Sequence, residues 1–168
     1  KDNLTRAHEL YNPVKKNIKI KEAYNKDMDW VESICKTYKP DIVVLDMGDK
    51  FKTQGTFARE DQALKANAIY ARQIAKTHGC AMFYMSQLSA EAEGKVLLNQ
   101  SMMEGSRTGK AAEADVMMLI AKNPPVETPN GAEKDDMIRH INIVKNKLSG
   151  WHGKFVCQLD YLTARYSA

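Results

Sequence analysis

An acidic side chain closes the most strongly strand-like run of this sequence. Asp46 directly follows the apolar, β-branched run 42–45. A carboxylate at the end of a buried strand can hold a divalent cation beside a phosphate group, directly or through a water molecule. The same carboxylate can also simply cap the next turn, and Asp46 taken alone leaves both interpretations open.

A polar amide closes the next apolar run along the chain. Gln87 ends the segment Tyr84-Met85-Ser86-Gln87. Its side chain could contact a terminal phosphate on one side and a loop on the other. Alternatively, it is a polar residue whose hydrogen bonds are satisfied at a strand end.

Two lysines leave a later alternating segment and enter a glycine-containing turn. Lys145 and Lys147 are two residues apart, so their side chains point to the same side of a strand. There they could meet a polyanion such as a triphosphate. The alternative is that they protect the exposed edge of a hairpin against aggregation.

Further basic residues lie in the segments that follow Asp46 and Gln87. Lys50, Lys52 and Arg59 come after Asp46, whereas Lys95 comes after Gln87. If the two loops converge on a groove or a pore, these side chains would contact nucleic-acid phosphates, and binding would weaken steeply with salt. Otherwise they are ordinary solvated loop residues.

Residue spacing argues against two other kinds of site. The segment 104–111 contains Gly109-Lys110, but only three residues separate Gly105 from Gly109, and Ala111 stands where a P-loop has a hydroxyl. We therefore reject a P-loop in this segment. The four histidines show no metal-ligand spacing, and the three cysteines form no C-x-x-C pair.

The elements that position these residues alternate between strands and helices. Such alternation predicts an α/β fold, with a mostly parallel sheet flanked by helices and antiparallel strands at the C-terminal end. Ligands of parallel sheets bind at the carboxyl ends of the strands, which directs attention to Asp46, Gln87 and the lysine pair. We expect both faces of the central strands to be buried. The predicted strands are 17–21, 41–46, 81–85, 116–121, 137–144, 154–159 and 161–166, the predicted helices are about 28–38, 59–77 and 110–114, and 90–109 is predicted to be a mobile loop.

Length and composition bound the class of protein. The chain has 168 residues, 43% of them hydrophobic, and a formal net charge of +4. This length suggests one domain, and the apolar content argues against disorder. No apolar run approaches the roughly 20 residues of a membrane span, so we expect no membrane partner. The separated cysteines and the lack of a signal-peptide pattern favour a reducing, cytoplasmic location.

Four segments together resemble the RecA-like ATPase domain of hexameric replicative DNA helicases, meaning the DnaB type and the related phage primase-helicases. The segments are Pro40–Asp46, Met82–Ser89, Glu113–Ile120 and Val144–Gly150, in this order. The resemblance extends from about residue 18 to residue 166. It is the ordered set, rather than any single motif, that carries it.

The resemblance implies a role for each matching residue. Asp46 matches the Walker B aspartate that positions Mg²⁺, and Gln87 matches the polar residue that senses the γ-phosphate. Lys145 and Lys147 match the basic pair that reaches the nucleotide of the neighbouring subunit. The family commonly has Arg at the second of these positions, and Lys147 lacks the planar fork of arginine. The loops that carry Lys50, Lys52, Arg59 and Lys95 match those that track single-stranded DNA.

The resemblance also implies what the whole protein would be. Residues 1–168 would form the C-terminal portion of a RecA-like domain, with the P-loop upstream of residue 1, so this portion alone is expected to be inactive. The implied function is an ATP-driven, ring-forming replicative helicase subunit that translocates on single-stranded DNA in a bacterial or phage-infected cell. The implied cofactors are ATP, or another NTP, and Mg²⁺. The implied partners are single-stranded DNA, further copies in a hexameric ring, and a primase domain or a polymerase.

Two alternatives stay open at this point. A RecA-type recombinase or repair ATPase shares the same core but forms filaments. A non-hydrolysing RecA-fold module would only bind DNA or a partner protein.

Overall fold

The computed structural model describes residues 2–105, 109–124, 126–127, 133–134 and 136–167. The helices are α1 (Asp2–Tyr11), α2 (Met28–Tyr38), α3 (Glu60–His78) and α4 (Gly109–Glu113). The strands are β1 (Ile42–Leu45), β2 (Ala81–Tyr84), β3 (Val116–Lys122), β4 (Val126–Glu127), β5 (Glu133–Lys134), β6 (Ile138–Asn146), β7 (Gly153–Asp160) and β8 (Arg165–Ser167). Within these ranges no helix is both long and apolar enough to cross a bilayer.

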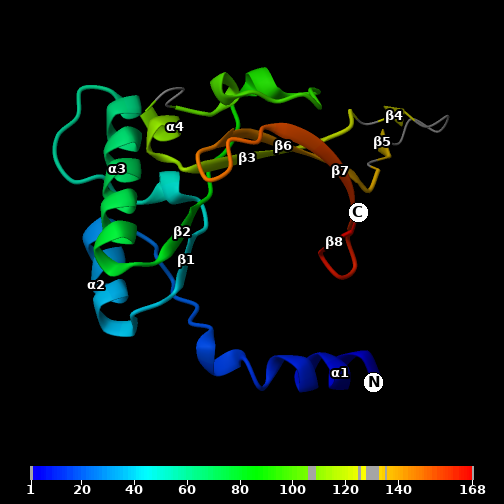
Figure 1. The fold of residues 1–168 in the computed structure, drawn as a ribbon, viewed down its shortest axis with the longest axis horizontal. Coiled ribbons are helices and arrows are strands. Elements are labelled where there is room, and N and C mark those ends of the chain that lie inside the picture. Colours follow the sequence, from blue (N-terminus) through cyan, green and yellow to red (C-terminus); the bar gives the residue numbers. More distant parts are fainter. Residues whose placement is uncertain (1, 106–108, 125, 128–132, 135, 168) are drawn as a thin grey trace.

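Two strands and two helices form the first core of the α/β fold. β1 and β2 pair in parallel from Ile42↔Ala81 to Leu45↔Tyr84. Figure 1 shows α2 and α3 together on one side of this pair. The core between them contains, among others, Met28, Val31, Cys35, Leu45, Ala71, Ile74 and Cys80.

Local signals in the sequence bound the two long helices of this core. Asp27 caps α2 by accepting a hydrogen bond from the Trp30 backbone N at 3.0 Å. α2 ends at Lys39, which adopts a left-handed conformation directly before Pro40. Gly79 ends α3 in the same way, with φ of 64°.

The second face of the parallel pair is open, which corrects the prediction that both faces are buried. On β1, Ile42 is 60% exposed and Val44 is 58% exposed, and Phe83 of β2 is also exposed. The cause is that α2 and α3 lie on the same side. Because side chains of a strand alternate between its faces, every second apolar residue remains uncovered.

The remaining main strands form an antiparallel sheet in the order β3-β6-β7-β8. The predicted third parallel strand is β3, but it pairs antiparallel with β6, as in Ile120↔Ile141. β3 and β6 are the arms of one long hairpin, which the short β4–β5 pair extends. An apolar run does not reveal whether its partner strand is parallel or antiparallel. The sequence therefore predicts more parallel strand pairing than the structure has.

The segment after β2 is packed onto one face of the antiparallel sheet. It contains short 3-10 turns at Ala90–Ala92 and Gln100–Met102. Leu98 and Met102 are buried in the same cluster as Met117 and Leu119 of β3. The expected irregular loop is therefore a covering layer of the second core.

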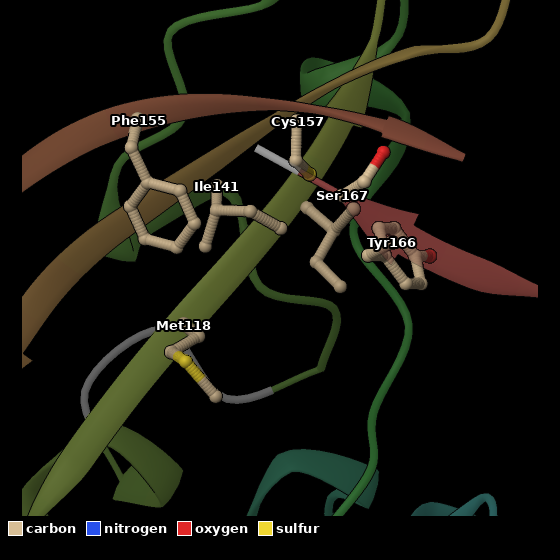
Figure 2. A pocket seen from close by; sticks show the side chains of 7 residues that line it. Met118, Ile141, Phe155, Cys157, Tyr166 and Ser167 are labelled. Atoms are coloured by element: carbon tan, nitrogen blue, oxygen red, sulfur yellow. The ribbon is translucent and has the colours of Figure 1, made fainter.

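The opposite face of the antiparallel sheet carries an apolar hollow of about 330 Å³ (Figure 2). The hollow is lined by Met118, Ile120, Ile141, Phe155, Cys157, Tyr166 and Ser167. None of the described residues that line it carries a charged side chain.

Both ends of the chain differ from the sequence prediction. Residues 17–21 form no strand, and Ile20 is 87% exposed, because no strand in the described part of the chain pairs with this alternating segment. Before this segment, residues Asp2–Tyr11 form helix α1, which was not predicted. At the other end, residues 161–164 form a turn in which Ala164 has a φ of 51°, so β8 begins only at Arg165.

Candidate functional site

Asp46 and Gln87 lie at the same edge of the parallel pair. Backbone pairing continues beyond the strands, since Met85 N donates to Leu45 O at 3.1 Å and Gly48 N donates to Met85 O at 2.8 Å. The turn after β1 therefore runs beside the segment after β2. Asp46 and Gln87 are both exposed there, so a ligand at the carboxyl edge can reach their side chains.

A buried ion pair ties this edge to α4. Lys110 Nζ lies 2.9 Å from Asp49 Oδ2 and donates to Ser86 Oγ at 2.7 Å. Ser86 Oγ in turn donates to Asp49 Oδ2, and Tyr84 OH donates to Asp49 Oδ1 at 3.1 Å. The Lys110 and Asp49 side chains are only 3% and 12% exposed. Each buried charge is thus matched by an opposite charge and by hydrogen bonds.

The turn after β1 sits tightly against an aromatic ring. A Cβ atom on Gly48 would lie 2.6 Å from Cζ of Tyr84, so any larger residue there would displace the ring. Burial raises the pKa of the Tyr84 hydroxyl, and the Asp49 charge raises it further. The hydroxyl therefore stays protonated and remains a donor to Asp49.

Lys145 of β6 and Lys147, which directly follows β6, contact the other end of α4. Lys145 Nζ donates to Ala111 O and, at 3.3 Å, to Ala112 O. Lys147 Nζ donates to Ala112 O at 3.4 Å and lies 3.6 Å from the Asp115 carboxylate. Because the last carbonyls of a helix have no partner within it, the two lysines cap the C-terminal end of α4.

The surroundings of Lys145 change the pKa of its ammonium group. Burial lowers the pKa of Lys145, and the neighbouring charge of Lys147 lowers it further. Arg72 of α3 holds the same end of α4, donating to Glu113 O at 2.6 Å and to Asp115 Oδ1 at 3.1 Å. α4 therefore connects the strand-end network with the lysine pair.

The four basic loop residues are all exposed but lie in two separate segments. Lys50, Lys52 and Arg59 belong to the segment between β1 and α3, and Lys95 belongs to the segment between β2 and α4. Figure 1 shows the first segment looping out beside α3 and the second lying over α4 and β3. Arg59 makes two hydrogen bonds to Asp61, at 3.0 and 2.9 Å.

Two residues of the edge were missed by sequence reasoning. Lys110 stands in the segment that fails as a P-loop, and nothing in the spacing links it to Asp49. The available signal was the small residues around it, Gly109, Ala111 and Ala112, which allow a short helix to approach its neighbours closely.

The edge fits a magnesium ion that arrives with phosphates. Mg²⁺ is usually held by one or two carboxylates, together with substrate phosphates and water. Asp46 offers an exposed carboxylate, whereas Asp49 is engaged by Lys110. In the described part of the chain no group of three or more His, Cys, Asp or Glu is placed to hold a metal.

Solved structures share this fold. One is a DnaB-like replicative helicase that was studied with its interactions with primase; it matches at a TM-score of 0.71 and 16% identity, over 86% of this chain and 36% of that chain. Another is the ATPase domain of G40P, with a TM-score of 0.70 and 14% identity, over 84% of this chain and 51% of that chain. No family model and no curated protein matches the sequence.

These matches define the class of fold. The chain shares the fold of part of the two matched chains, in agreement with the resemblance to DnaB-type helicases that the four sequence segments carry. It spans 36% and 51% of the length of the two matched chains.

Proposed function

We propose that this chain is part of an NTP-driven, ring-forming replicative DNA helicase. One observation carries the proposal. Asp46 and Gln87 stand exposed at the carboxyl edge of a parallel pair, in a fold shared with helicase ATPase domains. The nucleotide, ATP or another NTP, would bind at this edge in a cytoplasmic protein of a bacterial or phage-infected cell.

Asp46 and Gln87 have separate tasks in this proposal. Asp46 would hold Mg²⁺, which neutralises charge on the phosphates when it is bound. The Gln87 amide would donate a hydrogen bond to the terminal phosphate. The backbone carbonyl of Gln87 already accepts a hydrogen bond from Glu104 N at 3.2 Å, so a movement of the Gln87 backbone is passed to the segment that covers the second core.

Lys145 and Lys147 would act on the nucleotide of a neighbouring copy. Lys147 has a side chain that is 45% exposed, so it is accessible. Hydrogen bonds from a charged donor to a phosphate are stronger than those to a neutral carbonyl. A phosphate of the adjoining copy would therefore compete with the α4 carbonyls for these lysines.

Single-stranded DNA would be held by the exposed basic residues Lys50, Lys52, Arg59 and Lys95. Contacts to backbone phosphates carry little sequence information, so the proposed binding has weak base preference. A primase domain or a polymerase would be further partners of the complete helicase.

The first experiment measures Mg²⁺-dependent ATP hydrolysis by the full-length protein with Asp46→Ala. We expect a loss of roughly 10²–10³-fold, because the metal would lose its protein ligand. Asp41→Ala is the matched control, since Asp41 is also exposed but precedes β1. Hydrolysis by Asp46→Ala at the wild-type rate would refute the metal role.

The second experiment tests the action between copies. Lys147→Ala and Asp46→Ala proteins are each expected to be inactive, and they are mixed before the assay. If the two residues act across an interface, some interfaces in the mixture contain both native residues and hydrolysis returns in part. A mixture as inactive as its components, from proteins shown to assemble together, would place both residues in one copy and overturn the trans role.

A further inference from the structure

Lys110 is a buried charged residue that the proposed function does not use. Its ammonium group contacts residues from two other segments, the turn after β1 and the end of β2, while Lys110 itself belongs to α4. We propose that Lys110 is a positioning residue, which fixes Asp46 and Gln87 relative to each other and to the lysine pair at the end of β6, Lys145 and Lys147. This inference rests on the proposed function of the edge.

The two residues that Lys110 contacts, Asp49 and Ser86, lie close along the chain to the two candidate residues. Asp49 follows Asp46 by three residues, within the compact turn Gly48–Lys50, and Ser86 directly precedes Gln87. One ammonium group binds both side chains, at 2.9 Å and 2.7 Å. Moving either strand end would therefore break a contact to Lys110.

The turn that holds Asp49, Gly48–Lys50, is packed tightly. Gly48 lies against the Tyr84 ring, and the Tyr84 hydroxyl binds the same Asp49 carboxylate at 3.1 Å. Asp49 therefore has little freedom to follow a displaced ammonium. The network specifies one arrangement of the edge.

Folding stability alone does not explain the ion pair between Lys110 and Asp49. Taking two charges out of water costs about as much as their attraction returns, and apolar residues of similar volume often serve as well. What a buried ion pair supplies is a defined geometry, because it tolerates few alternative arrangements.

Lys110 also affects, through α4, the position of Lys145 and Lys147. Lys110 lies in the first turn of α4, and the carbonyls of Ala111 and Ala112 hold Lys145 and Lys147. The five-residue helix is too short to bend much between these contacts. Lys110 thus sets the place from which the lysine pair departs when it reaches a neighbouring nucleotide.

The test uses the full-length protein with Lys110→Met and Asp49→Asn combined, which removes both charges and leaves none unpaired. Lys76→Met, an exposed change on α3, is the matched control. Steady-state ATP hydrolysis gives kcat and KM, a Mg²⁺ titration gives the half-saturating concentration, and urea unfolding reports folding.

We expect the double variant to fold and its kcat to fall about 10–100-fold, as for other groups that orient a metal ligand. The half-saturating Mg²⁺ concentration should rise, while KM for ATP changes less than about threefold because phosphate binding rests mostly on other groups. A folded double variant with wild-type kcat and Mg²⁺ dependence would overturn the inference.

The Ser86→Ala variant and the wild-type protein separate the remaining outcomes. If the double variant does not fold, Ser86→Ala replaces it, since this change removes one hydroxyl and leaves the ion pair. A raised Mg²⁺ requirement in Ser86→Ala supports positioning, and an unchanged one overturns it. A wild-type protein without any Mg²⁺-dependent hydrolysis would instead refute the proposed function itself.

Discussion

Two aspartates within one turn have opposite surroundings, and this difference separates their roles. Asp46 is exposed and accessible to a ligand, whereas the Asp49 side chain is only 12% exposed and is paired with Lys110. From the sequence only Asp46 could be singled out, because it directly follows the apolar run. Their burial makes Asp46 the candidate ligand and Asp49 part of the frame that holds it.

Tyr84 gives a pH-dependent prediction at the residue scale. A tyrosine in the unfolded chain ionises near its ordinary pKa of 10.0, and burial and Asp49 raise the folded pKa above that value. The contribution of Tyr84 to stability is thus complete below pH 10 and declines as pH rises further, by at most about 1.4 kcal/mol per pH unit. Tyr84→Phe cannot ionise, so urea unfolding at about pH 9 and about pH 11 should show a smaller decline. An unchanged decline would contradict the assigned burial.

Gly48 gives a packing prediction. Gly48→Ala places a methyl group where the Tyr84 ring lies, at 2.6 Å from Cζ. We expect a loss of about 1–3 kcal/mol in the free energy of unfolding, because the ring must move. The same change in a Tyr84→Ala background should cost clearly less, as measured by a double-mutant cycle in urea. Equal costs in the two backgrounds would show that the ring is not the obstacle.

At the scale of elements, a substitution at the C-terminal end of α2 should increase the stability of the protein. Lys39 ends this helix with φ of 46°, a conformation that glycine adopts without steric cost. Lys39→Gly should therefore stabilise the protein by about 0.5–1 kcal/mol. Lys76→Gly, within α3, is the control and should destabilise it by about 1 kcal/mol. Destabilisation by Lys39→Gly in thermal or urea unfolding would contradict the assigned helix end.

Helices α2, α3 and α4 and most strands were predictable because their signals are local, whereas α1 was not predicted. Asp27 and Pro40 bound α2, and Gly79 ends α3, through effects that act within a few residues. Strand direction is different, since the apolar run of β3 fits either a parallel or an antiparallel neighbour. The alternation at residues 17–21 likewise shows a period of two but cannot show whether a partner strand exists.

The candidate site was predictable only in part, for the same reason. Asp46 and Gln87 follow apolar runs, so their place at strand ends can be read along the chain. The contact between Asp49 and Lys110 joins residues 61 positions apart. No local pattern reports such a contact, and it becomes visible only when α4 is placed against the two strand ends.

At the scale of the whole molecule, DNA binding gives a salt-dependent prediction. Lys95 is exposed in the segment that covers the second core. If it contacts one phosphate of single-stranded DNA, Lys95→Ala should reduce the slope of log K against log salt by about 0.7. Fluorescence anisotropy of the full-length protein on two unrelated sequences should show the same change. An unchanged slope, equal to that of Lys76→Ala on α3, would remove Lys95 from the DNA contact.

The proposed function depends on where the nucleotide lies in the assembled protein. Its most direct test is the structure of the full-length assembly with Mg²⁺, a slowly hydrolysed ATP analogue and single-stranded DNA, determined by electron cryomicroscopy. We predict a closed ring in which Asp46 faces the metal, Gln87 faces the terminal phosphate, and Lys147 of the adjoining copy reaches the same nucleotide. An assembly with Asp46 and Lys147 far from every interface, and with no nucleotide at the ends of β1 and β2, would contradict the account.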